Sequence, residues 1–184
     1  MRPDLELTSV PGWALTPTRP DADLSGRAWT IMAFGPDGAD VARDWLAQIA
    51  SVGGESAVRL HEVDPGRAIE ALTADLADAR VGWRLMMAGP ADACLHLRGA
   101  ATGLGVADDE MTVASTDVDS RAVHCVHCAA VTRARVQLDE VLACGSCGRN
   151  LLVYYHVSRR GGTYLGFMVD AEEPAGAMSR KTPA

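Results

Sequence analysis

The sequence predicts an α/β fold, in which a small parallel-sheet αβ domain precedes an antiparallel β ribbon that is held together by a metal ion. Three observations predict it. Apolar runs of strand length alternate with helically spaced apolar residues up to residue 120. Four of the five cysteines of this 184-residue chain then fall in one short stretch, and the sign of the charge changes between the two regions. With 48% hydrophobic and 22% charged residues, the composition is typical of soluble globular proteins.

Four segments follow from the sequence pattern. Residues 1–26 contain four prolines and few apolar residues, so they predict an extended arm with Trp13 as its apolar anchor. Residues 27–120 form the predicted αβ domain, and residues 121–170 form the predicted ribbon. Residues 171–184 are predicted to be a flexible tail.

Strand and helix patterns alternate along the predicted αβ domain. Short apolar runs that end at Gly or Pro signals predict buried strands, and apolar residues at every third or fourth position predict helices. The predicted strands are 28–34, 57–63, 81–88 and 110–115, and the predicted helices lie around 39–49, 69–76 and 95–101. This alternation is typical of a parallel sheet covered by helices, with right-handed crossovers.

The first strand-to-helix turn does not favour a nucleotide site. The turn contains only Gly35 and Gly38, whose spacing does not match Gly-x-Gly-x-x-Gly. Asp37 and Asp40 would repel a phosphate, and we interpret them as carboxylates that stabilise the start of a helix. A different ligand at the carboxyl ends of the strands stays an open alternative.

The last predicted strand–helix–strand unit carries a resemblance. Residues 85–92, the following helix and residues 105–113 resemble the end of the nicotinamide module of ferredoxin reductases. That family usually has Cys-Gly-Pro where this chain has Ala88-Gly89-Pro90. The resemblance implies a degenerate reductase-like domain that has lost its cofactor, and the alternative is an ordinary βαβ unit with a Gly-Pro turn.

The charge distribution bears on partners and location. Residues 1–120 hold 9 basic and 19 acidic side chains, whereas residues 121–184 hold 8 and 5. The acidic majority disfavours nucleic acid, because binding phosphates needs a basic surface. No apolar run is long enough to span a membrane, and the first residues show no secretory signal, so we expect a cytoplasmic protein.

The cysteines form the strongest motif, C-x₂-C-x₁₅-C-x₂-C. This spacing is typical of a four-cysteine zinc site, and the predicted ligands are Cys125, Cys128, Cys144 and Cys147. Gly145 and Gly148 would permit a left-handed backbone in the second turn. The surrounding predicted strands, 131–137, 140–143, 150–157 and 163–169, indicate a zinc ribbon.

The metal and its role have an open alternative. Four thiolates leave no coordination position free, which predicts a structural zinc rather than a catalytic one. The same donors suit a single iron, as in a rubredoxin-like electron carrier. His124 and His127 flank the first cysteine pair. They are expected to face solvent or to contact the metal ligands without binding the metal themselves. His61, His96 and the lone Cys94 are expected to be structural, and no catalytic residue is predicted.

A β-hairpin is predicted after the second cysteine pair, where two tyrosine-rich strands meet at an Arg-Arg-Gly-Gly turn. Arg and Tyr are typical of protein interfaces, although a single-stranded nucleic acid could use the same residues, and a solvated turn is the plainer alternative. The predicted partner contacts are Tyr154, His156, Arg159, Arg160 and Tyr164.

The cysteine motif and the strands after it carry the most specific resemblance. His-Cys-Val-His-Cys at 124–128, Cys-Gly-Ser-Cys-Gly at 144–148, Tyr-Tyr-His-Val-Ser-Arg at 154–159 and Tyr-Leu-Gly-Phe at 164–167 resemble the C-terminal region of the DmmA-like family. That family supplies a small subunit of bacterial dimethylamine monooxygenase.

The resemblance implies a place in a multicomponent, NAD(P)H-dependent enzyme that converts dimethylamine to methylamine and formaldehyde. Haem, flavin and iron–sulfur groups are then expected on partner subunits, which include a reductase and a catalytic subunit. This chain is expected to be a non-catalytic, zinc-binding subunit of the hetero-oligomer.

Overall fold

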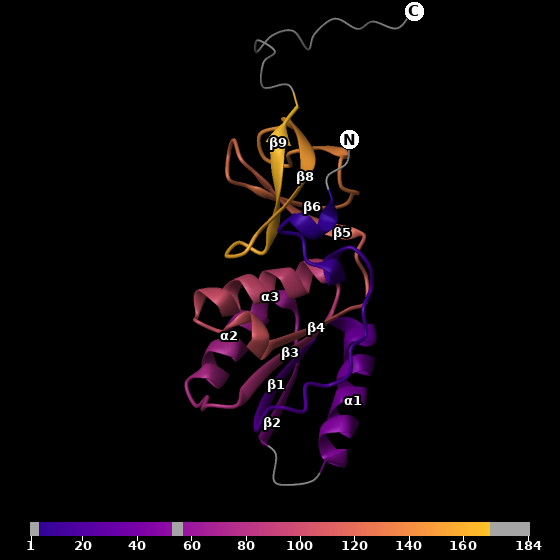
Figure 1. Ribbon diagram of the computed structural model, residues 1–184. Helices are drawn as coiled ribbons and strands as arrows, with labels where there is room; N and C mark the ends of the chain where they lie inside the picture. Colours follow the sequence, from indigo (N-terminus) through magenta and orange to yellow (C-terminus); the bar gives the residue numbers. More distant parts are fainter. Residues whose placement is uncertain (1–3, 53–56, 170–184) are drawn as a thin grey trace, which may run out of the picture.

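The computed structural model describes residues 4–52 and 57–169, which build two β-sheets joined through helix α3 (Figure 1). The predicted tail, 171–184, lies outside the described residues. Among the residues that are described, no helix is long and apolar enough to cross a membrane.

The first sheet is parallel and has the order β2-β1-β3-β4. We call it and its helices the αβ unit. Its strands are β1 (Ala28–Ala33), β2 (Ala57–Glu62), β3 (Trp83–Gly89) and β4 (Met111–Ser115), and its helices are α1 (Gly35–Ser51), α2 (Pro65–Leu76) and α3 (Ala91–Gly103). The predicted alternation of strands and helices is confirmed.

Helices cover both faces of this sheet, with α1 on one face and α2 and α3 on the other (Figure 1). Trp45 and Ile49 of α1 pack against Ile31 of β1, and Leu72 of α2 packs in the opposite core. Helix α1 begins earlier than the apolar spacing predicts. Residues 35–37 are exposed and carry no apolar signal, but Pro36 is favourable in the first turn of a helix.

The second sheet has the order β6-β5-β9-β8-β7, and we call it the ribbon. Its strands are β5 (Ser120–Cys125), β6 (Val131–Arg135), β7 (Val141–Ala143), β8 (Asn150–Ser158) and β9 (Thr163–Met168). The predicted β ribbon is confirmed, and three of its four strand pairs are antiparallel as expected, whereas β5 and β9 pair in parallel. The β8–β9 hairpin returns its second strand beside β5, in the same direction as β5.

The ribbon packs directly on α3. Ala91 and Leu95 of α3 belong to the same buried core as Leu151, Val153 and other ribbon residues. The β8–β9 turn lies so close to α3 that a Cβ atom on Gly162 would be 2.2 Å from the carbonyl oxygen of Leu95. A Cβ on Gly99 would likewise be 2.9 Å from the carbonyl oxygen of Arg160. Two glycines therefore allow the backbones to touch.

The N-terminal arm connects the two sheets. It is not extended throughout, because residues Leu5–Leu7 and Gly12–Ala14 form 3₁₀ turns. The predicted anchor Trp13 packs against both the ribbon core and the α2–α3 core. Further along, the N–H of Thr18 donates to the carbonyl of Ser115 at the end of β4 (3.1 Å).

Replacing Gly162 tests the junction. Gly162→Ala adds a methyl group at φ +59° against the Leu95 carbonyl, so the turn must lift from α3. We expect the free energy of unfolding to fall by about 3 kcal/mol, from left-handed strain and overpacking together. Gly105→Ala is the control, because Gly105 has φ +95° but no atom within 4 Å of the added Cβ. Urea unfolding of both variants measures the difference, and equal losses would contradict the close packing.

Candidate metal centre

Two turns of the same backbone geometry carry the four cysteines. The first turn follows β5, and the second follows β7. The N–H of Cys125 donates to the carbonyl of Ala130 (2.9 Å), and the N–H of Cys144 donates to the carbonyl of Arg149 (2.8 Å). Each turn therefore closes on itself five residues after its first cysteine, which directs its two cysteine side chains to one side.

A left-handed residue completes each turn. Gly148 has φ +70° and donates its N–H to the carbonyl of Cys144, and Ala129 has φ +62° and donates to the carbonyl of Cys125. The prediction for Gly148 is confirmed, but that for Gly145 is wrong. Gly145 is not left-handed, and its N–H donates instead to Thr132 Oγ1 of β6 (2.9 Å).

The four sulfur atoms lie within 4.8 Å of one another. The Sγ atoms of Cys125 and Cys147 are 3.8 Å apart, and those of Cys128 and Cys144 are 3.6 Å apart. A tetrahedron with zinc–sulfur bonds of ~2.3 Å has sulfur–sulfur edges of ~3.8 Å. The donor set and its spacing therefore fit a tetrahedral metal ion.

The second turn favours a thiolate at Cys144 but not at Cys147. The N–H groups of Cys147 and Ser146 point at the Cys144 sulfur and lower the pKa of this thiol to about 6. At Cys147 the N–H of Arg149 lowers the pKa, but burial and the neighbouring sulfurs outweigh it and raise the pKa to about 11. A bound divalent cation would hold all four groups as thiolates, since it supplies the compensating positive charge.

The other cysteine and the flanking histidines lie outside the sulfur cluster. Among the described residues, the cluster comprises only the four cysteines of the motif. His127 is exposed and His124 is half-buried on β5. Cys94 is fully buried in α3, 3.8 Å from the carbonyl of Gly89, and burial raises the pKa of its thiol.

The predicted partner residues separate into two groups. Tyr154, His156, Arg159 and Arg160 are exposed. Tyr164 is 1% exposed, so the prediction that it contacts a partner is wrong. Its hydroxyl donates to the carbonyl of Ala14 in the arm (3.3 Å), and the buried guanidinium of Arg121 lies 5.5 Å from the centre of its ring.

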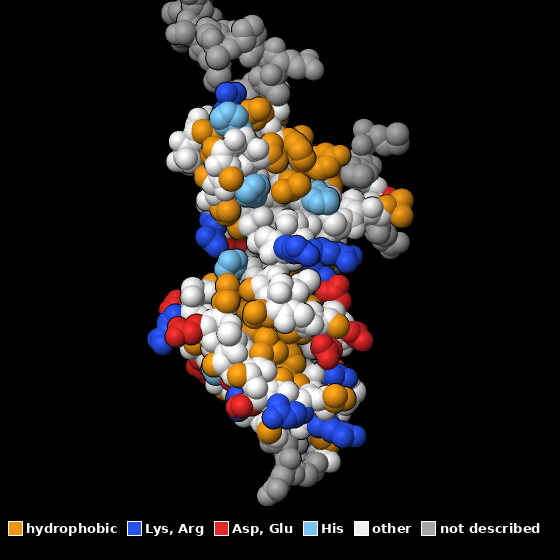
Figure 2. All heavy atoms as spheres, turned by 90° about the vertical axis from the view of Figure 1, so that its left-hand side faces the viewer, with side chains coloured by type: hydrophobic (Ala, Val, Ile, Leu, Met, Phe, Trp, Pro, Cys, Tyr) orange, Lys and Arg blue, Asp and Glu red, His pale blue; other side chains and the backbone are white. Residues whose placement is uncertain are grey.

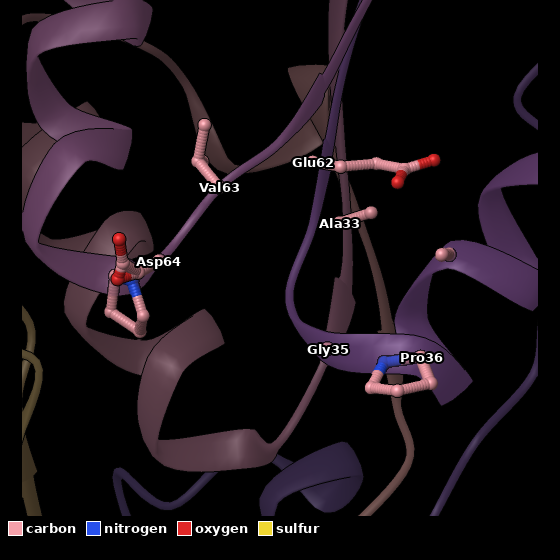
Figure 3. Close-up of a pocket in the computed structure, with 8 residues that line it drawn as sticks. Ala33, Gly35, Pro36, Glu62, Val63 and Asp64 are labelled. Atoms are coloured by element: carbon pink, nitrogen blue, oxygen red, sulfur yellow. The ribbon is translucent and has the colours of Figure 1, made fainter.

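A hollow of 470 Å³ lies at the carboxyl ends of β1 and β2, where α/β sheets commonly bind ligands (Figure 3). Glu62 points to the same side as Pro36, and Asp64 lies on the opposite side with Val63. Carboxylates at this position would oppose a phosphate.

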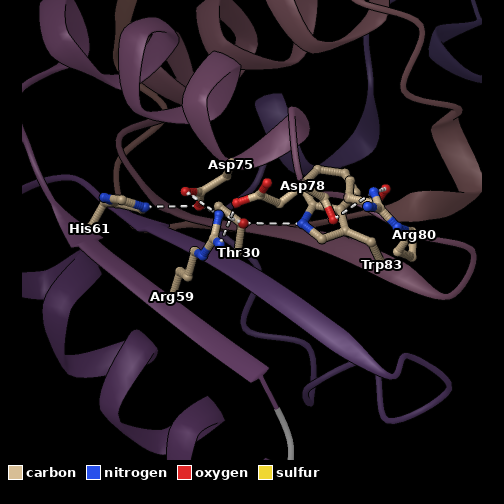
Figure 4. A network of polar contacts seen from close by, with 8 residues as sticks. Thr30, Arg59, His61, Asp75, Asp78, Arg80 and Trp83 are labelled. Carbon is tan, nitrogen blue, oxygen red and sulfur yellow. Dashed lines mark hydrogen bonds and ion pairs between the residues drawn. The ribbon is translucent and has the colours of Figure 1, made fainter.

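A buried polar network joins α2 to the first sheet (Figure 4). Asp75 accepts hydrogen bonds from Thr30 Oγ1 (2.7 Å) and Arg59 (3.1 Å), and His61 Nε2 lies 2.9 Å from its carboxylate. Trp83 Nε1 in turn donates to Thr30 Oγ1 (3.1 Å). Sequence reasoning missed Asp75, although a carboxylate three positions after Leu72 in the apolar stripe of α2 was a usable signal.

These features define a class of protein, in which a helix-covered parallel sheet carries a ribbon with a four-cysteine site that could hold a metal ion. Residues 122–167 match the family model described as "Dimethylamine monooxygenase subunit DmmA-like, C-terminal domain". The resemblance predicted for this region is therefore confirmed.

One relative extends the similarity beyond the ribbon. The chain is 39% identical over 103 residues to the heme-dependent oxidative N-demethylase delta subunit of Ectopseudomonas mendocina (strain ymp). The match covers 56% of this chain and 58% of the relative. No solved structure matches the chain.

Removing one sulfur tests the metal centre. Cys144→Ser should abolish stoichiometric metal binding, because an alcohol at this position leaves three thiolates. Cys94→Ala is the matched control and should keep one metal ion per chain, because Cys94 lies outside the cluster. Elemental analysis of both purified variants measures this. Full metal content in Cys144→Ser would contradict the assignment.

Asp75 is predicted to contribute stability that depends on pH. Burial raises the pKa of its carboxyl, but hydrogen bonds from Thr30, His61 and Arg59 outweigh this and hold the pKa below its ordinary value. A carboxyl with a lowered folded-state pKa stabilises the fold above its unfolded-state pKa of about 4, and this contribution is lost as the pH falls through the folded-state value.

Asp75→Asn should therefore lower the free energy of unfolding by about 2 kcal/mol at pH 7, because it removes hydrogen bonds to a charged group. The difference from the unchanged chain should shrink below about pH 4. Asp78→Asn is the control, since Asp78 is exposed and contacts Arg59 alone among the pairs described. Denaturant unfolding at several pH values measures both, and an equal effect of the two substitutions would refute the role of Asp75.

Proposed function

We propose that this chain is a zinc-binding accessory subunit of a multicomponent oxidative N-demethylase that converts dimethylamine to methylamine and formaldehyde. The observation that carries the proposal is the tetrahedral set of four sulfurs inside the region that matches the DmmA-like C-terminal domain. Catalysis belongs to the partner subunits, which would hold the haem, flavin and iron–sulfur groups.

The proposed zinc has a structural role. Cys125, Cys128, Cys144 and Cys147 would fill all four positions of a tetrahedral ion, so none is left for a substrate or a water molecule. The ion would fix the turn between β5 and β6 to the turn between β7 and β8. When bound, the metal supplies only this cross-link and the compensation of thiolate charge.

A single-iron electron carrier is the second candidate. The observation that favours it is the exposure of the cluster, because Cys128 and Cys147 are only half-buried, which would give an electron a short path from the surface. Four thiolates accept iron as well as zinc. The identity of the metal therefore separates the two functions.

The accessory role has further support in the αβ unit. The hollow at the ends of β1 and β2 is flanked by carboxylates, and the buried network around Asp75 satisfies its own polar groups. The similar protein from Ectopseudomonas is itself named as a delta subunit. We infer that the αβ unit serves as a docking element for a reductase partner in the cytoplasm rather than as a reductase.

Co-expression with the other subunits of such an enzyme tests the proposal. Purification through this chain should recover a complex that contains one zinc ion for each copy of this chain and that demethylates dimethylamine. The isolated chain should be colourless and should not shift DNA or RNA in a gel. Stoichiometric iron with thiolate-to-iron absorption in the isolated chain would favour the electron carrier, and a failure to recover any partner subunit would refute the accessory role.

A further inference from the structure

The outer face of the ribbon carries a row of apolar side chains across three strands. Val141 of β7 pairs with Leu152 of β8, and Leu152 pairs with Phe167 of β9. Paired residues point to the same face of a sheet. Leu151 and Val153, which flank Leu152, are fully buried, so this row points away from the core.

A second row lies beside the first. Leu165 of β9 pairs with His124 of β5, and His124 pairs with Val131 of β6. Leu165 lies two residues before Phe167 and therefore on the same face. Leu165 and Phe167 therefore join the two rows along β9, and the ring of Tyr154 lies 5.4 Å from that of Phe167 in an edge-to-face arrangement.

These side chains form one surface, which we call the ribbon patch. Val141 is 50% exposed, Tyr154 47%, Val131 44% and Phe167 41%. Figure 2 shows hydrophobic side chains together with histidines over the part of the molecule that the ribbon forms. Single exposed apolar residues are ordinary, whereas a contiguous patch on a sheet typically marks an interaction site.

The charge around the ribbon patch indicates the kind of partner. None of the five ribbon strands contains Asp or Glu, although Asp139 and Glu140 directly precede β7. Arg133 and Arg135 of β6 pair with carboxylates of the chain itself, whereas the β8–β9 turn contributes the exposed Arg159 and Arg160. Acidic side chains gather instead over the αβ unit, in the lower part of Figure 2. Two copies that met face to face through this surface would bring their arginines together, which disfavours self-association.

We propose that the ribbon patch docks another subunit of the enzyme, through a surface that is apolar at its centre and carries carboxylates at its edge. This inference rests on the proposed function as a subunit, and it specifies which face of the chain binds the partner. The Arg159–Arg160 turn then has two roles, since its backbone packs on α3 while its side chains remain at the edge of the patch.

Charge insertion at the centre of the patch tests the inference. Val141→Asp and Phe167→Asp should each weaken binding of one co-expressed partner subunit at least tenfold, because each buries a carboxylate in an apolar contact. A reductase partner that docks on the αβ unit should still bind. Leu7→Asp is the matched control, since Leu7 is 86% exposed in the N-terminal arm, outside both the ribbon patch and the αβ unit, and it should bind as the unchanged chain does. Tyr154→Ser is a milder variant for the case in which an Asp variant does not fold, and metal content and melting temperature report folding.

The possible outcomes distinguish a failure of the proposed docking surface from a failure of the proposed function. If the unchanged chain binds its partners and the folded patch variants bind equally well, the patch is not the interface, and the proposed function stands. If no partner binds the unchanged chain, both fail. If light scattering shows a dimer of the isolated chain that Val141→Asp dissociates, the occupant is a second copy, and the inference is overturned.

Cover by residues 170–184 of the same chain is the remaining alternative. The isolated full-length chain should enhance the fluorescence of the apolar dye 8-anilinonaphthalene-1-sulfonate, and Phe167→Asp should remove this enhancement. Equal fluorescence in both proteins would show that the patch is not free, which would overturn the inference.

Discussion

The convergence of two cysteine turns is the constraint on which the ribbon depends. Each turn begins at the end of one strand and leads into the next, so the sulfur cluster brings the β5–β6 turn against the β7–β8 turn. The ribbon core itself is small and is completed by residues from outside it, namely Val10 and Ala14 of the arm and Leu95 of α3. With a metal ion bound, a cross-link at one end and a shared core at the other would together hold a sheet that has little interior of its own.

The same junction shapes the αβ unit. The N–H of Ala91, at the start of α3, donates to the carbonyl of Asp117 in the segment that leads to the ribbon (2.7 Å). Helix N-termini of this kind bind anions in many α/β proteins, but here the chain uses part of that capacity itself. At the start of α1, a Cβ on Gly38 would be 2.5 Å from the carbonyl oxygen of Ala88, so this helix also packs tightly on the sheet. The start of α3 is thereby tied to the segment that leads into the ribbon.

Local patterns predicted most helices and strands and the clustering of the four cysteines, because apolar periodicity and cysteine spacing are both local signals. Strand β5 was missed, since its apolar core is only Ala122-Val123 between Arg121 and His124. The burial of Tyr164 could not be predicted either, because it depends on a contact with Ala14, 150 residues away in the sequence. The division of the chain at residues 26, 120 and 170 stays a prediction, since arm, helix and ribbon share one core.

X-ray absorption at the metal edge of the purified full-length chain tests the central claim most directly. A zinc edge that fits four sulfur neighbours at ~2.3 Å, with no oxygen or nitrogen neighbour, is the expected result. A site with fewer than four sulfurs, or a protein that binds no metal, would contradict the view that the four cysteine side chains close around a structural ion.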